Sequence, residues 1–207
     1  GPYLDLAGRL AQFVGGLASG GVREIEIEYE GEIASWDLEP ITNAALVGLL
    51  KTFEGGDVNQ VNASMIAHDR GIRVLATTKT EGSEYGSSVS IRATFSDAGM
   101  RSVQGALIRR IGFEPRIIGI DEFLTEAVPE GSMLIVTNRD IPGMIAGVAG
   151  ALAGSGINIA QMNLSRDKAG GSALSILNLD SMVDDATLET IRGIPGILDV
   201  TQVILDR

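Results

Sequence analysis

The sequence predicts an α+β protein of two domains, residues 1–130 and 131–207. Apolar and acidic residues alternate strictly over residues 22–33, which is typical of a strand with one wet face. The second part reads in the order strand, helix, strand, strand, helix, strand, whereas the first part mixes helices and strands less regularly. Between the two parts, Pro129, Glu130 and Gly131 carry the turn composition expected at a domain boundary.

Composition excludes several classes of protein. The 207 residues include 44% hydrophobic residues, which is enough for one large or two small domains with real cores. The chain contains no cysteine, so disulfide scaffolds, thiol nucleophiles and thiolate metal sites are excluded. A formal charge of −11 disfavours nucleic acids and anionic membranes as partners, because both need clustered Lys and Arg.

Targeting signals are also missing from the sequence. The longest apolar run, residues 144–154, is about half a membrane span, and no signal-peptide pattern is found. We therefore expect a soluble, cytoplasmic protein. The chain begins Gly1-Pro2 without a methionine, which suggests a piece of a longer protein.

In the first domain, apolar residues at helical spacing predict a helix over residues 4–17, which Gly20-Gly21 would end. In the strand over residues 22–33, one face carries Ile25, Ile27 and Tyr29, and the other carries a row of glutamates. We interpret this row as a solvated face that blunts edge pairing rather than as a cation site. The further elements expected are a helix opening at Pro40, a helix over 58–68 that Gly71 ends, and strands over 72–78, 87–95, 100–108 and 116–120.

The second domain is expected to form a split βαβ, or ferredoxin-like, sandwich with both helices on one face of the sheet. Gly170-Gly171 supplies the hairpin between the middle strands, and Asp184 lies where a helix N-terminus favours negative charge. The expected elements are strands over 133–137, 157–167, 173–180 and 198–205, and helices over 142–153 and 184–192.

The most informative motif is the polar turn at residues 138–144. Pro142 suits the first helical position, which would make Ile141 the cap and leave the Asp140 carboxylate available. Gly143 lets a backbone or a small ligand come close. The unpaired N–H groups at the helix start suit a carboxylate, and Asp140 could hold an ammonium group. The turn therefore predicts a receptor for a free amino acid.

With these motifs in view, residues 132–207 resemble an ACT domain, the amino-acid-sensing module of many metabolic enzymes. The whole chain resembles, more narrowly, the C-terminal regulatory half of the long form of D-3-phosphoglycerate dehydrogenase. The residues that carry the resemblance are Asn138-Arg139-Asp140-Ile141-Pro142-Gly143-Met144, Ser155-Gly156-Ile157-Asn158-Ile159, Ala169-Gly170-Gly171-Ser172-Ala173-Leu174, Gly1-Pro2-Tyr3-Leu4-Asp5-Leu6-Ala7 and Arg116-Ile117-Ile118-Gly119-Ile120-Asp121.

This resemblance implies an intervening α+β domain followed by the ACT domain, and a parent enzyme that acts in serine biosynthesis. It implies that NAD binds to catalytic domains outside this stretch, so that this stretch holds no cofactor and no catalytic residue. The sequence itself contains no Gly-x-Gly-x-x-Gly that opens a helix after a strand. The resemblance further implies a homo-oligomer through the ACT and intervening domains.

In family members that bind L-serine, the effector lies between two ACT domains. The matching positions in this sequence are Asn138, Asp140, Gly143, Met144 and Asn158. Asp140 would pair with the α-ammonium, the helix-start N–H groups would take the carboxylate, and Asn158 of a neighbouring chain would bind polar atoms.

Two alternatives stay open. Asp140 and Asn158 could merely hold turns, and the whole region could be a structural oligomerisation module with no effector.

Other candidates are weaker. Some relatives carry an anion site of Lys, His and Arg, but the corresponding positions here read Arg116, Leu124 and Val128, so we do not carry that site over. Arg109 and Arg110 could supply another anion patch, although adjacent arginines are more often a solvated edge. His68 and Asp69 are adjacent on a helix and do not face each other.

Overall fold

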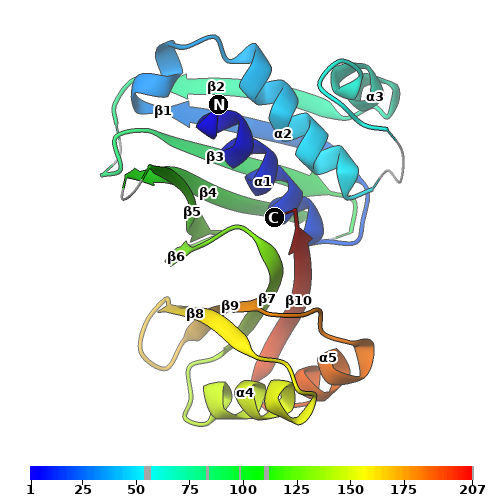
Figure 1. Cartoon of the computed structure of the whole chain (residues 1–207), viewed down its shortest axis with the longest axis vertical. Coiled ribbons are helices and arrows are strands. Elements are labelled where there is room, and N and C mark those ends of the chain that lie inside the picture. The colour runs from blue at the N-terminus through cyan, green and yellow to red at the C-terminus, as the bar shows by residue number, and fades with distance from the viewer. Residues whose placement is uncertain (54–56, 83, 98, 110–111, 207) are drawn as a thin grey trace. The chain divides into compact units, whose positions relative to one another are not determined.

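The computed structural model describes residues 1–53, 57–82, 84–97, 99–109 and 112–206 (Figure 1). Its contacts divide the chain into two compact units, Gly1–Asp121 and Glu122–Arg207. Both units combine a sheet with helices, which confirms the predicted α+β class. Residues 122–130, which join the first sheet region to the second in sequence, are counted with the second unit.

The first unit is a twisted sheet with helices on one face (Figure 1). Its strands lie in the order β2-β1-β3-β4-β5, with β1 and β2 parallel and the other pairs antiparallel. Parallel neighbours need a crossover connection, which the segment between β1 and β2 supplies. The elements are α1 (Pro2–Gly16), β1 (Val22–Glu30), the 3₁₀ helix η1 (Gly31–Ser35), α2 (Glu39–Lys51), α3 (Ala63–Asp69), β2 (Arg73–Lys79), β3 (Ser88–Phe95), β4 (Gly99–Arg109) and β5 (Phe113–Ile120).

Strand β1 has the two faces that its alternation predicts. Ile25, Ile27 and Tyr29 are fully buried. The glutamates of the opposite face pair with cations of the neighbouring strands: Glu24 with Arg73 at 3.1 Å, Glu26 with Arg92 at 3.1 Å, and Glu28 with Lys79 at 2.9 Å. The expectation that this row blunts an edge was wrong, because β1 lies between β2 and β3.

Helices α1 and α2 cross at unusually close range. A Cβ added at Gly48 would lie only 2.0 Å from the carbonyl oxygen of Gly8, so glycine is required for this approach. The pair covers the buried face of the sheet, where Leu6, Leu10 and Leu49 are fully buried.

Three expected elements of the first unit have different bounds. The helix expected over 58–68 begins only at Ala63, because the side chains of Asn59 and Asn62 bond to backbone N–H groups and hold the preceding residues in turns. The first strand ends at Glu30 because Gly31, with φ of 84°, starts a 3₁₀ turn. Strand β5 begins three residues earlier than expected, at Phe113.

The second unit confirms the ferredoxin-like βαββαβ order. Its four-stranded sheet has the order β10-β7-β9-β8 with antiparallel neighbours, and both α4 and α5 cover one face (Figure 1). Leu134, Leu152, Leu177 and Ile191 belong to the core between sheet and helices. The elements are β6 (Phe123–Ala127), which was not predicted, then β7 (Gly131–Arg139), α4 (Met144–Gly154), β8 (Ile159–Arg166), β9 (Ser172–Leu179), α5 (Asp185–Arg192) and β10 (Ile197–Leu205).

The start of α4 corrects one sequence-based prediction. The helix begins at Met144, with Gly143 as its N-cap at φ of 93°, so Pro142 is not the first helical residue and Ile141 is not the cap. The reason is a tight turn, in which the Ile141 N–H donates to the Arg139 carbonyl at 2.9 Å. A left-handed residue must then reverse the chain before the helix can start, and glycine adopts that conformation without strain.

Candidate functional site

The β7–α4 corner, defined here as residues 138–144, is fastened to the β8–β9 hairpin through Asp140. The Asp140 N–H donates to the Gly171 carbonyl at 2.9 Å. Its carboxylate oxygen Oδ2 accepts a hydrogen bond from the Gly170 N–H at 3.1 Å and lies 3.3 Å from Nη1 of Arg166. The expectation of an available carboxylate is therefore corrected, because Asp140 already holds a cation and a backbone N–H.

The Arg166 guanidinium that pairs with Asp140 can still be replaced by another cation. Arg166 is 61% exposed and Asp140 is 28% exposed, and ion pairs at such sites contribute little to stability. The Oδ1 atom of Asp140 makes no hydrogen bond with any residue in the described part of the chain. A small ammonium group could displace the guanidinium and meet a carboxylate that the hairpin already orients.

Beside Asp140, the first turn of α4 offers backbone donors. The N–H groups of Met144, Ile145 and Ala146 have no acceptor within the helix, because the first intrahelical bond runs from Gly147 to the Gly143 carbonyl at 2.9 Å. A helix start of this kind suits an anionic group. The corner thus carries a carboxylate at Asp140 and, from Met144 onward, backbone donors at a helix start.

Met144 and Asn138 have structural side chains. Met144 is 8% exposed, and a Cβ added at Gly196 would lie 2.9 Å from its sulfur, so its side chain packs against the turn before β10. Asn138 is 3% exposed, and its Nδ2 donates to the Arg139 carbonyl at 2.6 Å. Asn138 therefore braces the corner from within, and Met144 can offer a ligand only its backbone N–H.

Asn158 lies at the opposite end of α4 from Asp140. Its Nδ2 donates to Oδ2 of Asp180 at 2.7 Å, and its carbonyl accepts the Asp180 N–H at 3.1 Å. Eleven helical residues separate the two ends by about 16 Å. The structure thus brings together Asn138, Asp140, Gly143 and Met144 within one chain, and it leaves Asn158 apart from them.

Sequence reasoning missed Arg166 and Gly170 as neighbours of Asp140. The glycine pair identified the hairpin, and Gly170 does adopt φ of 74° there. The contact with Asp140 is tertiary, however, and no local spacing announces it. The hairpin is further stiffened by Asp167, whose pKa is lowered because its carboxylate accepts the backbone N–H groups of Lys168 and Ser172.

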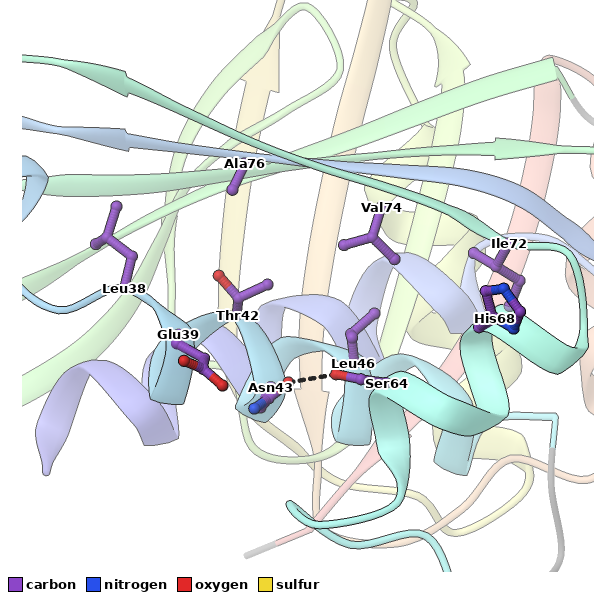
Figure 2. Close-up of a pocket in the computed structure, with 10 residues that line it drawn as sticks. All are labelled: Leu38, Glu39, Thr42, Asn43, Leu46, Ser64, His68, Ile72, Val74 and Ala76. Atoms are coloured by element: carbon purple, nitrogen blue, oxygen red, sulfur yellow. Dashed lines mark hydrogen bonds between the residues drawn. The ribbon is translucent and has the colours of Figure 1, made fainter.

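The first unit contains a separate cavity of about 530 Å³ between α2, α3 and β2 (Figure 2). Leu46, Val74 and Ala76 form its apolar wall. Three of its polar side chains have partners within the protein: Asn43 accepts a hydrogen bond from Ser64 at 2.7 Å, and the hydroxyls of Thr42 and Tyr29 are 2.8 Å apart. We assign no chemistry to this cavity.

The weaker candidates from the sequence gain no support as sites. The expectation that His68 and Asp69 do not face each other was wrong, because Nδ1 of His68 lies 3.5 Å from Oδ1 of Asp69, but both side chains are exposed. Arg116 pairs with Glu114 at 2.7 Å, Leu124 is exposed, and Arg110 lies outside the described residues. Over the described ranges, no group of three or more His, Cys, Asp or Glu side chains could hold a metal ion. In the same part of the chain, every helix is too short or too polar to cross a lipid bilayer.

Comparison with known proteins gives two family matches. Residues 1–121 match the D-3-phosphoglycerate dehydrogenase intervening domain, and residues 132–196 match the ACT domain.

Relatives named D-3-phosphoglycerate dehydrogenase cover nearly the whole chain. Those of Methanocaldococcus jannaschii and Synechocystis are each 36% identical over 99% of the chain, and that of Bacillus subtilis is 31% identical over 99%. The chain spans only 36–38% of the length of these relatives.

Proposed function

The chain belongs to the D-3-phosphoglycerate dehydrogenase family, and from this membership we propose that it is a regulatory region that binds L-serine at the β7–α4 corner. The observation that supports the proposal most strongly is that the corner carries the Asp140 carboxylate four residues before the first N–H groups of α4, which have no acceptor within the helix. Together they match the ammonium and the carboxylate of a free amino acid. In a full-length enzyme, the attached domains would carry NAD and the dehydrogenase chemistry.

The effector site is proposed to be completed by a second copy of the chain. Helix α4 has no charged residue, and its exposed residues are Ala146, Gly150, Ala153 and Gly154. Small residues of this kind allow two helices to approach closely. If two α4 helices pack antiparallel across a two-fold axis, the start of one lies beside the end of the other. Asn158 of the second copy would then reach the serine held at Asp140.

Strand β8 supports the same interface. It is the edge of its sheet, and among its described neighbours it pairs only with β9. Its residues Met162 and Leu164 are 40% and 56% exposed, and they stand opposite Leu177 and Ser175 on the sheet face that α4 covers. An apolar edge without Lys or Pro is a surface that invites pairing. We therefore propose a homo-oligomer in which β8 and α4 form the contact.

Isothermal titration calorimetry with L-serine tests this proposal. The parent chain should bind L-serine but not D-serine, and Asp140→Asn should weaken binding about tenfold or more, because it removes a charged hydrogen bond. Asp199→Asn, which changes an exposed carboxylate on β10, is the matched control and should bind like the parent. Absence of heat with the parent chain, or equal affinity in Asp140→Asn, would contradict the proposal.

A purely structural oligomerisation module is the second candidate, and the apolar α4 and β8 surface favours it as well. It predicts the same oligomer with no response to L-serine. Native mass spectrometry of the 207-residue chain with and without the amino acid separates the two candidates. Serine retained on the oligomer supports the effector site, whereas an oligomer that retains none supports the structural module.

A further inference from the structure

A short segment of the second unit, residues 122–130, is held against the sheet by side chains of β8 and β9. We call this segment the strap. The Ser165 hydroxyl donates to the Leu124 carbonyl. The Asn178 amide donates to the carbonyls of Val128 and Glu130 at 2.9 and 3.2 Å. Three side-chain bonds therefore fasten the backbone that immediately follows the first compact unit.

Strand β8 connects the strap to the Asp140 corner. Ser165 and Arg166 are consecutive residues, so their side chains point to opposite faces of the sheet. Ser165 stands opposite Leu174 and bonds the strap, whereas Arg166 stands opposite Ala173 and pairs with Asp140. A displacement of the end of β8 must therefore change both contacts together.

Strand β8 is also less constrained than the central strands of its sheet. It is an edge strand, paired within the described residues to β9 alone, and its register shifts between Ile159 and Gln161. A bulge of this kind disrupts the ladder locally. Edge strands with few cross-strand bonds belong to the less stable parts of a fold, where local opening occurs.

Two buried polar side-chain atoms on this face of the sheet have no hydrogen-bond partner among the residues that the structure describes. They are Nδ2 of Asn163, a donor, and Oδ1 of Asn178, an acceptor. Asn163 stands opposite Ile176, two residues before Asn178, so the two amides are diagonal neighbours on the face that carries Ser165. Buried polar atoms are rarely left unpaired. A small shift of β8 along β9 that joins these two amides would satisfy both atoms at once.

We propose that β8 is a lever that couples amino-acid binding at Asp140 to release of the strap. This proposal rests on the proposed effector site. The ligand's ammonium replaces the Arg166 guanidinium on Asp140, and β8, freed at its end, shifts along β9. The Asn163 and Asn178 amides then pair, and the bond from Ser165 to Leu124 is lost. The strap, which follows the first unit in the sequence, is thereby held less tightly when the effector is bound.

Thermodynamic linkage predicts an effect on serine affinity that a purely structural bond between Ser165 and Leu124 would not produce. If serine binding releases the strap, then weakening the strap must strengthen serine binding by the same factor. Ser165→Ala removes one hydroxyl on the face of the sheet opposite to the Arg166 side chain that pairs with Asp140. It should therefore bind L-serine about threefold to fivefold more tightly than the parent.

Hydrogen–deuterium exchange of the 207-residue chain, read at peptides that cover residues 122–130, measures the strap directly. Saturating L-serine should speed exchange there about fivefold. Arg166→Ala should speed exchange at these peptides by a similar factor without any ligand, because it removes the ion pair with Asp140. Arg73→Ala, which removes an exposed arginine paired with Glu24 in the first unit, is the matched control and should leave the strap unchanged.

The outcomes separate this inference from the proposed function. Calorimetric binding of L-serine with no change in strap exchange overturns the lever and leaves the effector site standing. No binding of L-serine, with faster strap exchange in Arg166→Ala, overturns the effector site and supports the coupling through β8. Equal or weaker serine affinity in Ser165→Ala also overturns the lever.

Discussion

Arg166 is paired with Asp140, with 3.3 Å between Nη1 and Oδ2, at the carboxylate where we propose that the ammonium group of an amino acid binds. The hairpin that supplies Arg166 also supplies the Gly170 N–H to the same oxygen at 3.1 Å. The carboxylate is therefore oriented by the hairpin before any ligand arrives. Because the Arg166 guanidinium is exposed, a ligand ammonium can replace it as the partner of Asp140.

This exchange predicts the effect of removing the resident cation. Arg166→Gln should bind L-serine up to about fivefold more tightly than the parent, because the ligand no longer displaces a paired charge. Arg166→Lys keeps the charge and should bind like the parent. Titration calorimetry at low and high salt measures both variants. Weaker binding in Arg166→Gln would mean that Arg166 holds the ligand instead of competing with it.

Gly143 should tolerate no side chain. Its φ of 93° is in the left-handed region, so Gly143→Ala should lower the free energy of unfolding by about 1–2 kcal/mol and disturb the start of α4. Gly21→Ala in the first unit is the control, since a Cβ there meets nothing within 4 Å and its φ lies outside the left-handed region. That control should raise stability by about 0.4–1 kcal/mol. Urea unfolding followed by circular dichroism distinguishes the two, and equal effects would contradict the assigned backbone conformation.

All elements of the second unit except β6 were predictable, because each of the others has a local cause. A continuous buried apolar run marks β7, the glycine pair marks the hairpin, and Asp184 caps α5 by accepting the Thr187 N–H at 2.7 Å. The start of α4 was placed two residues too early because proline at a first helical position is a common pattern. The competing left-handed turn at Gly143 depends on how the corner packs, which no short window of sequence contains.

The candidate site was predictable in its residue types and not in its contacts. Asp140 and Gly143 stand out as a carboxylate and a glycine at a strand-to-helix turn. The bonds of Asp140 with Arg166 and Gly170 depend on the pairing of β8 with β9. This pairing brings residues 26 and 30 positions away in the sequence to the corner. The position of Asn158 at the far end of α4 follows from helix length alone, and so could have been derived.

The exposed residues of α4 should control assembly. Ala153→Lys places a charge among them near the C-terminus of α4, where the helix itself favours a cation. The chain should therefore stay folded while the oligomer dissociates. Thr190→Lys on the exposed side of α5 is the control and should leave assembly unchanged. Sedimentation velocity measures the mass of each variant, and an intact oligomer in Ala153→Lys would show that α4 lies outside the contact.

The cap of α5 should make stability depend on pH in acid. The pKa of Asp184 is lowered from its usual 3.8 mainly because its carboxylate accepts the Thr187 N–H. A lowered folded-state pKa means that the stabilisation is complete above pH 3.8 and is lost as the pH falls through the folded-state value.

Asp184→Ala should therefore melt about 2–4 °C lower than the parent near neutral pH. The difference in melting temperature between the two proteins should narrow below pH 3.8, where the parent also loses its ionised cap. Differential scanning calorimetry from pH 7 to pH 2 follows this difference, and a constant value across that range would exclude the carboxylate as the source of the stabilisation.

The most direct measurement is a crystal structure of the chain grown in saturating L-serine. We expect one serine at the β7–α4 corner, with its ammonium on Asp140, its carboxylate at the N–H groups of Met144 and Ile145, and Asn158 of a second copy beside it. We also expect Arg166 to have left Asp140. A corner without serine, with the Asp140–Arg166 pair intact in every copy, would contradict the proposed effector site.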